Sequence, residues 1–394
     1  MFTLTGKYNS AAVYTDNCDS ETCSQLMQLL NQEFVTGSSI KIMPDTHAGT
    51  GCVIGTTMTI TDKVVPNLVG VDIGCGMLAV KLSDKDINLD ALDCVITNEI
   101  PSGFSIHDEP TVFSLLDDLV ATVDFNRAFC SLGTLGGGNH FIEVDKDSNG
   151  DLWLVIHTGS RHLGVEVCKY YQNIAVKECY AESTSDKIQG IISSLKAEGR
   201  QTEIEHAIKD FKATYNYIPK DLCYVSGESF DNYIHDMKIT QEYATLNRML
   251  IMQHICNSMN FTIVEYFSTI HNYIDIDSMI LRKGSISAEA GETVIIPMNM
   301  RDGTLLCRGK GNPDWNYSAP HGAGRIMSRS QAKEAIPMEY FIDSMKDVYS
   351  TSVCESTIDE SPFAYKPMDE IMSNIKDTVE VIDVLKPIYN FKAH

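Results

Sequence analysis

Five residues of metal-binding type occupy positions from which they could serve one site. Asp72 and Cys75 are three residues apart on a glycine-containing turn, so a carboxylate and a thiolate could face one cation, or one of them could bridge two. His140, His157 and His271 follow at strand or loop positions. Thiolate, imidazole and carboxylate together suit Mn, Fe, Co or Zn, whereas Ca and Mg prefer oxygen ligands. A thiolate between two ions about 3.5–4 Å apart would form the two-metal arrangement that serves phosphoryl and nucleotidyl transfer.

Each of these residues has a simpler interpretation when it is taken alone. A histidine after a strand is more often a satisfied core or surface residue than a ligand, and Asp72 could be a turn or N-cap carboxylate. Their joint occurrence in glycine-rich loops favours a site, because glycine lets the backbone approach a ligand closely. Five such loops carry a His, Cys or Asp, namely residues 47–49, 72–76, 136–140, 157–161 and 321–325. We therefore expect these loops to converge.

His321 is the candidate nucleophile, since it stands among glycines and close to Arg325. The known phosphate motifs do not fit the chain. The segment 303–311 has five residues between its first two glycines, where a P-loop has four, and a glycine where a P-loop needs Ser or Thr. The Lys-x-Asp-Gly motif of most nucleotidyltransferase ligases is absent. If the protein forms a covalent nucleotide, a neutral imidazole can attack phosphorus and yield a phosphoramidate that is a good donor.

The charge of the chain requires a local source of positive potential if the partner is a polyanion. The sequence carries 31 basic and 53 acidic residues, a net charge of −22 with histidine neutral, which repels nucleic acid and anionic membranes. Residues 282–329 run against this trend with seven basic and four acidic residues, among which Trp315, Tyr317 and His321 are interleaved. This composition fits a surface that tracks a nucleic-acid backbone and stacks bases. The alternative is a solvated face with a buried tryptophan.

Two kinds of segment must position these loops. Apolar residues recur every three or four positions over 239–255, which predicts a helix with one buried stripe, and the segments 165–181, 186–214, 330–350 and 367–378 are similar. Short apolar runs predict strands at Cys52–Ile60, Met77–Leu82, Leu152–Ile156, Thr262–Phe267 and Val294–Pro297. Without a repeat or linker, this alternation predicts a single α/β domain over residues 1–394, with a mixed sheet at its core.

Composition excludes several classes of protein. Hydrophobic residues make up 43% of the 394 and charged residues 21%, which rules out disordered and fibrous chains. No apolar run approaches the ~20 residues that span a bilayer, and no signal peptide is evident, so we expect no membrane association. Twelve cysteines in a chain of this length fit reduced thiols in the cytoplasm.

Long motifs of the chain resemble the RtcB family of GTP-dependent RNA ligases. The matching stretches follow the family's order across almost the whole chain: MPDTHAGTG (43–51), GVDIGCGM (70–77), LGTLGGGNHFIEV (132–144), HTGSRHLG (157–164), HNY (271–273), RKGSISAEAG (282–291), HGAGRIMSRS (321–330) and VEVIDVLKPIYNFK (379–392). The resemblance implies a ligase that joins RNA ends with a 2′,3′-cyclic phosphate or 3′-phosphate to 5′-hydroxyl ends. It also implies two Mn²⁺ ions, GTP and a guanylylated histidine. We expect a monomer.

The resemblance assigns roles to individual residues. Asp72 and Cys75 match manganese ligands, with the cysteine between two ions, and His140 matches a ligand of the second ion. His157 and His271 match ligands of the first ion. His321 matches the histidine that becomes guanylylated. The remaining matches are Asn139 for a phosphate contact, Glu143 and Lys392 for guanine contacts, and Arg161, Lys283 and Arg325 for cations near the phosphates.

The chain departs from the family beside the expected guanine pocket. Met298 and Asn299 stand where many members have a small Gly-Ser pair, so Asn299 would contact the nucleotide in place of serine. This change motivates an alternative, a two-metal RNA end-processing enzyme (a cyclic phosphodiesterase or a 3′-guanylyl capping enzyme) that does not seal. A different class, a catalytically silent RNA-binding or metal-storage protein, predicts no GTP turnover.

Overall fold

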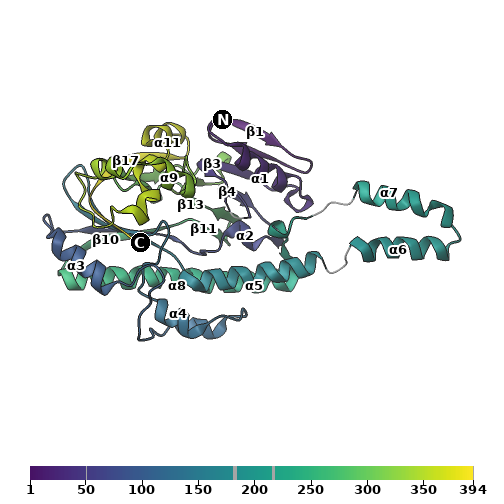
Figure 1. Cartoon of the computed structure of the whole chain (residues 1–394), viewed down its shortest axis with the longest axis horizontal. Coiled ribbons are helices and arrows are strands. Elements are labelled where there is room, and N and C mark those ends of the chain that lie inside the picture. The colour runs from purple at the N-terminus through teal and green to yellow at the C-terminus, as the bar shows by residue number, and fades with distance from the viewer. Residues whose placement is uncertain (50, 181–183, 215–217, 394) are drawn as a thin grey trace.

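Two β-sheets form the centre of the computed structural model (Figure 1), which describes residues 1–49, 51–180, 184–214 and 218–393. The first sheet is mixed, because β2 and β3 are parallel and its other pairs are antiparallel. In spatial order it contains β1 (Phe2–Thr5), β2 (Ser10–Val13), β3 (Ile40–His47), β4 (Ile54–Thr59), β12 (Ile280–Lys283) and β11 (Asn272–Asp275). This mixed α/β architecture confirms the fold class predicted from the sequence.

The second sheet is antiparallel throughout and carries the most buried strands. Its spatial order is β10 (Ile263–Ile270), β6 (Gly76–Leu82), β8 (Leu152–Thr158), β7 (Phe141–Lys146), β17 (Val379–Lys392), β15 (Gly303–Gly309) and β14 (Thr293–Asn299). All seven residues of β8 are buried, and its first five, Leu152–Ile156, form a continuous apolar run before His157 and Thr158. Two small ribbons complete the strands, one of β13 (Ser285–Ser287) with β16 (Ser318–Pro320), the other of β5 (Lys63–Val64) with β9 (Val225–Ser226).

The five predicted strands are confirmed, and all the predicted helical segments are helical, although two of them, 186–214 and 330–350, each hold two helices. The helices are α1 (Ser20–Leu30), α2 (Pro66–Val69), α3 (Leu89–Glu99), α4 (Phe125–Ser131), α5 (Arg161–Cys179), α6 (Thr184–Ala197), α7 (Ile204–Thr214), α8 (Gly227–Met259), α9 (Arg329–Ala335), α10 (Met338–Ser344) and α11 (Met368–Asn374). The segment 330–350 holds two helices because Pro337 cannot donate the hydrogen bond that would continue the first. Residue 181, the end of one predicted helix, lies outside the described residues.

The segment 186–214, predicted as helical, is an antiparallel pair rather than one helix. Gly199 takes a left-handed backbone (φ +74°) after α6, and the chain then turns back into α7. The pair projects from the body of the molecule as an arm (Figure 1). Among the described residues, no helix has the length and apolarity that crossing a lipid bilayer requires.

Helix α8 holds the glycine-rich loops through two buried polar side chains. Asn247 Oδ1 accepts hydrogen bonds from the backbone N–H groups of Gly133 (2.7 Å) and Thr134 (3.1 Å), and its Nδ2 donates to the Gly159 carbonyl oxygen at 3.2 Å. The next residue, Arg248, donates from Nη1 to the carbonyl oxygens of Gly74 (2.8 Å) and Thr158 (2.9 Å). Neighbouring positions of one helix therefore fix the glycine-rich loops 72–76 and 157–161 and the segment 133–134 that precedes the loop 136–140.

We expect Asn247→Leu to lower the free energy of unfolding by about 2–4 kcal/mol, because the buried N–H groups of Gly133 and Thr134 lose their acceptor. Urea denaturation followed by circular dichroism measures the change. Asn257→Leu, at an exposed position of the same helix, is the matched control and should stay within about 0.5 kcal/mol of the original protein. Equal stability of the two variants would contradict the role given to Asn247.

Candidate active site

Four predicted metal-binding residues meet at one edge of the second sheet because its strands are antiparallel. Cys75 directly precedes β6, whose first residues pair with the end of β8, where His157 lies. The end of β10, just before His271, pairs with the same start of β6. His140 directly precedes β7, whose first residue pairs with His157. In an antiparallel sheet the start of one strand lies beside the end of its neighbour, so residues far apart in sequence become adjacent.

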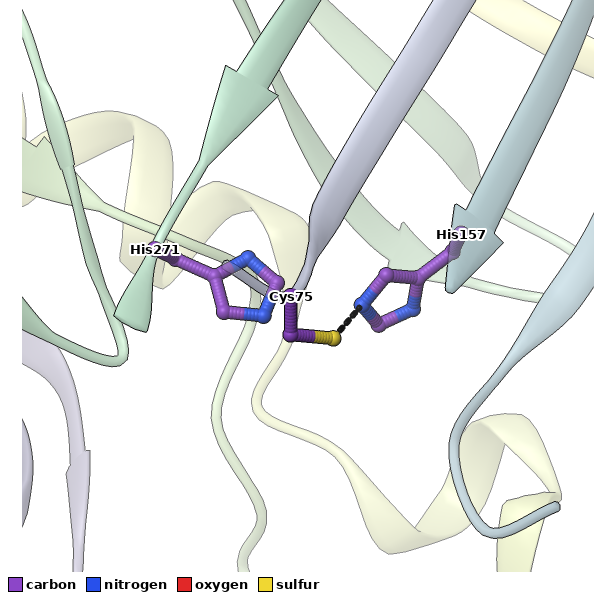
Figure 2. Close-up of side chains that lie close together, drawn as sticks. All are labelled: Cys75, His157 and His271. Atoms are coloured by element: carbon purple, nitrogen blue, oxygen red, sulfur yellow. Dashed lines mark hydrogen bonds between the residues drawn. The ribbon is translucent and has the colours of Figure 1, made fainter. Parts of the chain in front are cut away.

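The Cys75 sulfur lies between two groups of possible ligands. Its Sγ is 3.4 Å from His157 Nε2 and 3.4 Å from His140 Nε2. Figure 2 shows Cys75 between the rings of His157 and His271. Cys75, His157 and His271 form one group, and Asp72, Cys75 and His140 form the other; within each group the ligand atoms lie within 4.8 Å of one another. The structure thus brings together all five residues that the sequence suggested as ligands, with the cysteine common to both groups.

Hydrogen bonds orient the two imidazoles beside Cys75. His140 Nδ1 donates to the Leu135 carbonyl oxygen at 2.9 Å, and His157 Nδ1 donates to the Asn139 carbonyl oxygen at 3.2 Å. His157 Nε2 then keeps its lone pair and faces the cysteine, which is the arrangement that a metal-binding histidine needs, whereas His140 Nε2 faces both the cysteine and Asp72 Oδ2, which is 3.0 Å away. His271 is buried, and its Nδ1 has no hydrogen-bond partner among the described residues.

Burial sets the protonation of this cluster. It holds the pKa values of His157 and His271 well below their usual range, so both rings are neutral, as ligands must be. Burial alone would raise the pKa of Asp72, but the hydrogen bond and charge of His140 and the charge of Arg161 outweigh it and bring the pKa to about 2. Burial and the Asp72 charge raise the pKa of Cys75, an effect that a bound cation reverses. This donor set fits two transition-metal cations that share a thiolate.

His321 lies beside this cluster and is held by a carboxylate. Its ring centroid is 4.8 Å from that of His271. Its Nδ1 donates to Asp45 Oδ2 at 2.6 Å, and its backbone N–H donates to the same oxygen at 3.1 Å. The buried Asp45 comes from β3 of the first sheet. Because Asp45 keeps the proton on Nδ1, the lone pair of His321 is on Nε2. Sequence reasoning missed Asp45, although it lies within the motif at 43–51.

A pocket of about 320 Å³ joins His321 to the cysteine cluster. Its lining includes most of the residues predicted for a nucleotide, namely Asn139, Glu143, Asn299, Arg325 and Lys392, together with Asp72, Cys75, His157, His271 and His321. Arg161 and Lys283 are not part of this lining. The Arg161 guanidinium lies behind His140, with Nη1 3.2 Å from its Nδ1, and the Lys283 ammonium donates to the Asn67 carbonyl oxygen at 2.8 Å.

Glu360 organises the cations at one end of the pocket, and sequence reasoning did not find it. Its carboxylate contacts Arg325 (3.3 Å), Arg329 (2.7 Å) and Lys392 (2.7 Å), and accepts a hydrogen bond from Tyr365 Oη at 2.6 Å. Burial opposes ionisation, but the charges of Lys392 and Arg329 outweigh it and lower the pKa of Glu360 to about 2. Arg325 and Lys392, which were predicted to contact the nucleotide, are therefore positioned by ion pairs with Glu360.

Asn299 and Met298 lie where the chain departs from the family motifs. The Asn299 side chain closes its own turn, with Nδ2 donating to Asp302 Oδ2 at 2.8 Å and Oδ1 accepting from the backbone N–H of Arg301 at 3.0 Å. Met298 is buried and contributes to the pocket wall. At this wall, therefore, the pocket is lined by the Met298 side chain and by the Asn299 amide, which is already hydrogen-bonded within its own turn.

In the basic segment 282–329, the prediction that Trp315 stacks bases is wrong, and the buried tryptophan of the alternative interpretation is confirmed. Trp315 is buried and stacks on Tyr14 with ring centroids 3.8 Å apart. Arg282 is fully buried, donates to Ser318 Oγ at 2.9 Å and to Tyr273 Oη at 2.9 Å, and lies 3.6 Å from Asp275. Composition could not distinguish core cations with internal partners from solvated ones.

Comparison with known proteins identifies the family. The sequence model of the family described as "tRNA-splicing ligase RtcB" matches residues 25–124 and 117–393. The chain belongs to the RtcB family. It is 29% identical over 419 residues to the RNA-splicing ligase RtcB of Escherichia coli (strain K12), with 95% of each chain covered. It is 26% identical over 468 residues to the tRNA-splicing ligase RtcB of Aeropyrum pernix, with 92% of this chain and 90% of that protein covered.

We expect Cys75→Ala to reduce Mn²⁺ binding from about two ions per chain to nearly none, because the shared thiolate serves both groups. His140→Ala and His271→Ala should each weaken one ion and leave the other. Metal content after equilibrium dialysis, with electron paramagnetic resonance for a coupled Mn²⁺ pair, measures the effect. Cys168→Ala, a buried cysteine of α5, is the control. Unchanged metal content in Cys75→Ala would refute the shared ligand.

Proposed function

We propose that this RtcB-family protein is an RNA ligase that joins 2′,3′-cyclic phosphate or 3′-phosphate ends to 5′-hydroxyl ends, with GTP, two Mn²⁺ ions and a guanylylated His321. Its relatives are named RNA-splicing and tRNA-splicing ligases and match nearly the full length of the chain, which supports RNA ligation. The observation that carries the chemical proposal is the Asp45–His321 pair, which leaves an unprotonated Nε2 beside a cluster suited to cations.

The proposed reaction begins at His321. Nε2 attacks the α-phosphorus of GTP, the N–P bond forms as pyrophosphate leaves, and Asp45 balances the charge that develops on the ring. An oxygen of an RNA 3′-phosphate then takes the guanylyl group and frees His321. The 5′-hydroxyl of the second RNA attacks the activated 3′-phosphate, and GMP leaves. A cyclic phosphate end must first be opened to a 3′-phosphate by water.

Asp72, Cys75, His140, His157 and His271 would hold the Mn²⁺ ions. When bound, such ions neutralise phosphate charge and lower the pKa of coordinated water. At the Glu360 end of the pocket, Glu143 offers a carboxylate for the guanine base, since adjacent N–H donors such as guanine N1–H and its amino group fit one carboxylate. Strands and loops from His47 to Lys392 contribute to this pocket, which supports one catalytic domain over 1–394.

RNA with a 3′-phosphate and a separate RNA with a 5′-hydroxyl, mixed with GTP and Mn²⁺, should yield a sealed product, and α-labelled GTP should leave one GMP on the protein. His321→Ala should abolish both signals while its metal content stays intact. His206→Ala, on the projecting arm, is the matched control and should retain both. Labelling without sealing would assign the non-ligating alternative, and labelling of His321→Ala would refute the nucleophile.

We expect Asp45→Asn to slow GMP labelling by about 10²–10⁴-fold, because an amide neither balances the imidazolium charge nor enforces the Nδ1–H tautomer. Mn²⁺ binding and thermal stability should change little, since Asp45 is not one of the five ligand candidates. Rapid-quench measurement of labelling tests this. A labelling rate close to that of the original protein would contradict the role of Asp45.

A further inference from the structure

A second carboxyl group lies behind Glu143, and neither the proposed reaction nor the metal cluster uses it. Glu143 and Asp145 are two residues apart on β7, so both side chains point to the same face of the sheet. The strand register places Asp145 opposite Trp153 of β8 and Pro387 of β17. Asp145 is fully buried, and neither of its carboxyl oxygens has a hydrogen-bond donor among the N–H and O–H groups of the described residues.

Such a carboxyl group has to be protonated. An ionised carboxylate that is buried without a hydrogen-bond donor is strongly unfavourable, and a proton removes its charge. The carboxyl of Glu143 is hydrogen-bonded to it. Burial, and then the charge of Glu143, raise the pKa of Asp145 well above its usual range. Asp145 therefore donates, and Glu143 accepts.

The second partner of Glu143 comes from the neighbouring strand. Asn390 of β17 lies opposite Glu143 in the register, and its Nδ2 donates to Glu143 Oε2 at 2.5 Å. Glu143 is also part of the pocket lining, whereas Asp145 is not. The two donors thus hold the Glu143 carboxylate from the protein side and leave lone pairs for a ligand in the pocket.

We propose that Asp145 is a positioning residue whose proton keeps Glu143 an ionised and oriented acceptor for the N–H edge of a purine base. The inference deepens the proposed nucleotide site and depends on it. It adds a residue that contacts no ligand and acts only through Glu143. A neutral donor at this position also lets two carboxyl groups lie together in the core without mutual repulsion.

The pH dependence of base binding follows from the groups around Glu143. Burial raises the pKa of Glu143 to about 7, against the lowering effects of the hydrogen bonds from Asp145 and Asn390 and of the charge of Lys392. On β8, the residue paired with Glu143 is Val155, which carries no charge. The remaining titratable residues of the pocket are His47, Asp72, Cys75, His157, His271, His321, Arg325, Arg329 and Tyr365. Because the anion accepts the base, GTP should bind more tightly as the pH rises through about 7, and loss of the Asp145 donor should move this transition upward.

Two variants of nearly the same shape test the proposal. Asp145→Leu removes the donor, and Asp145→Asn replaces the O–H with an N–H. The measured quantity is the GTP concentration that half-saturates GMP labelling of His321, followed from pH 6 to 9 in the full chain with Mn²⁺. Relative to the original protein, we expect the transition to shift upward by about one pH unit in Asp145→Leu, which weakens the affinity about fivefold at pH 7 and about tenfold at pH 6, and to shift little in Asp145→Asn. A profile for Asp145→Leu that matches the original protein would overturn the proposal, as would equal shifts in the two variants.

Infrared spectroscopy tests the proton directly and does not depend on activity. At neutral pH the original protein should show the carbonyl stretch of a protonated, buried carboxyl group, and Asp145→Asn should lose it. Absence of this band overturns the proposal, even if Asp145→Leu fails to fold. If the band is present but no GMP is attached to the original protein, the proposed ligase reaction fails instead, so the two failures are distinguishable.

Discussion

Burial of Cys75 is the constraint on which this molecule depends. The sulfur lies at the meeting point of four strand ends, and each of these ends has to bring a polar side chain out of water to reach it. Buried polar groups are tolerated only when their hydrogen bonds are satisfied. Asn247 and Arg248 of α8 meet this requirement for the loops, since they supply donors and acceptors to backbone groups that no strand can reach. The long helix is therefore as much a part of the site as the loops.

The second constraint is the distribution of charge in the pocket. The chain carries a net charge of −22, yet the pocket collects Arg325, Arg329 and Lys392 around the carboxylate of Glu360, and Arg329 also pairs with Asp359. Three cations and these two carboxylates leave a positive excess of one charge, which attracts phosphate. The local field can therefore attract a polyanion although the global field repels it. Two cations of this cluster, Arg325 and Arg329, come from the basic segment 282–329, whereas Arg282 of the same segment has its partners in the core.

Local patterns predicted the elements well because each depends on neighbours in sequence. Apolar runs identified β4, β6, β8, β10 and β14, and the helical stripe at 239–255 lies inside α8. The prediction over 186–214 was less accurate. A stripe of apolar residues indicates that one face of a helix is buried, but it does not identify the element against which that face packs. Here α6 and α7 pack against each other after a turn. Trp315 was ambiguous for a related reason, since its partner, Tyr14, lies 301 residues earlier in the sequence.

The sequence alone determined the residue types of the site. Side chains with sulfur, imidazole and carboxylate donors stand on glycine-rich loops, and their motifs match one family across nearly the whole chain. Only the tertiary structure decided which of these side chains gather around the Cys75 sulfur. It also decided which nitrogen of each imidazole carries the proton and which carboxyl groups form hydrogen bonds with the site. Glu360 and Asp145 have no distinctive local pattern, and the motif that contains Asp45 does not indicate its partner, because the roles of these residues come from contacts with distant parts of the chain or from complete burial. Hydrogen bonding and desolvation depend on which groups are close in space, whereas the sequence gives only their separation along the chain.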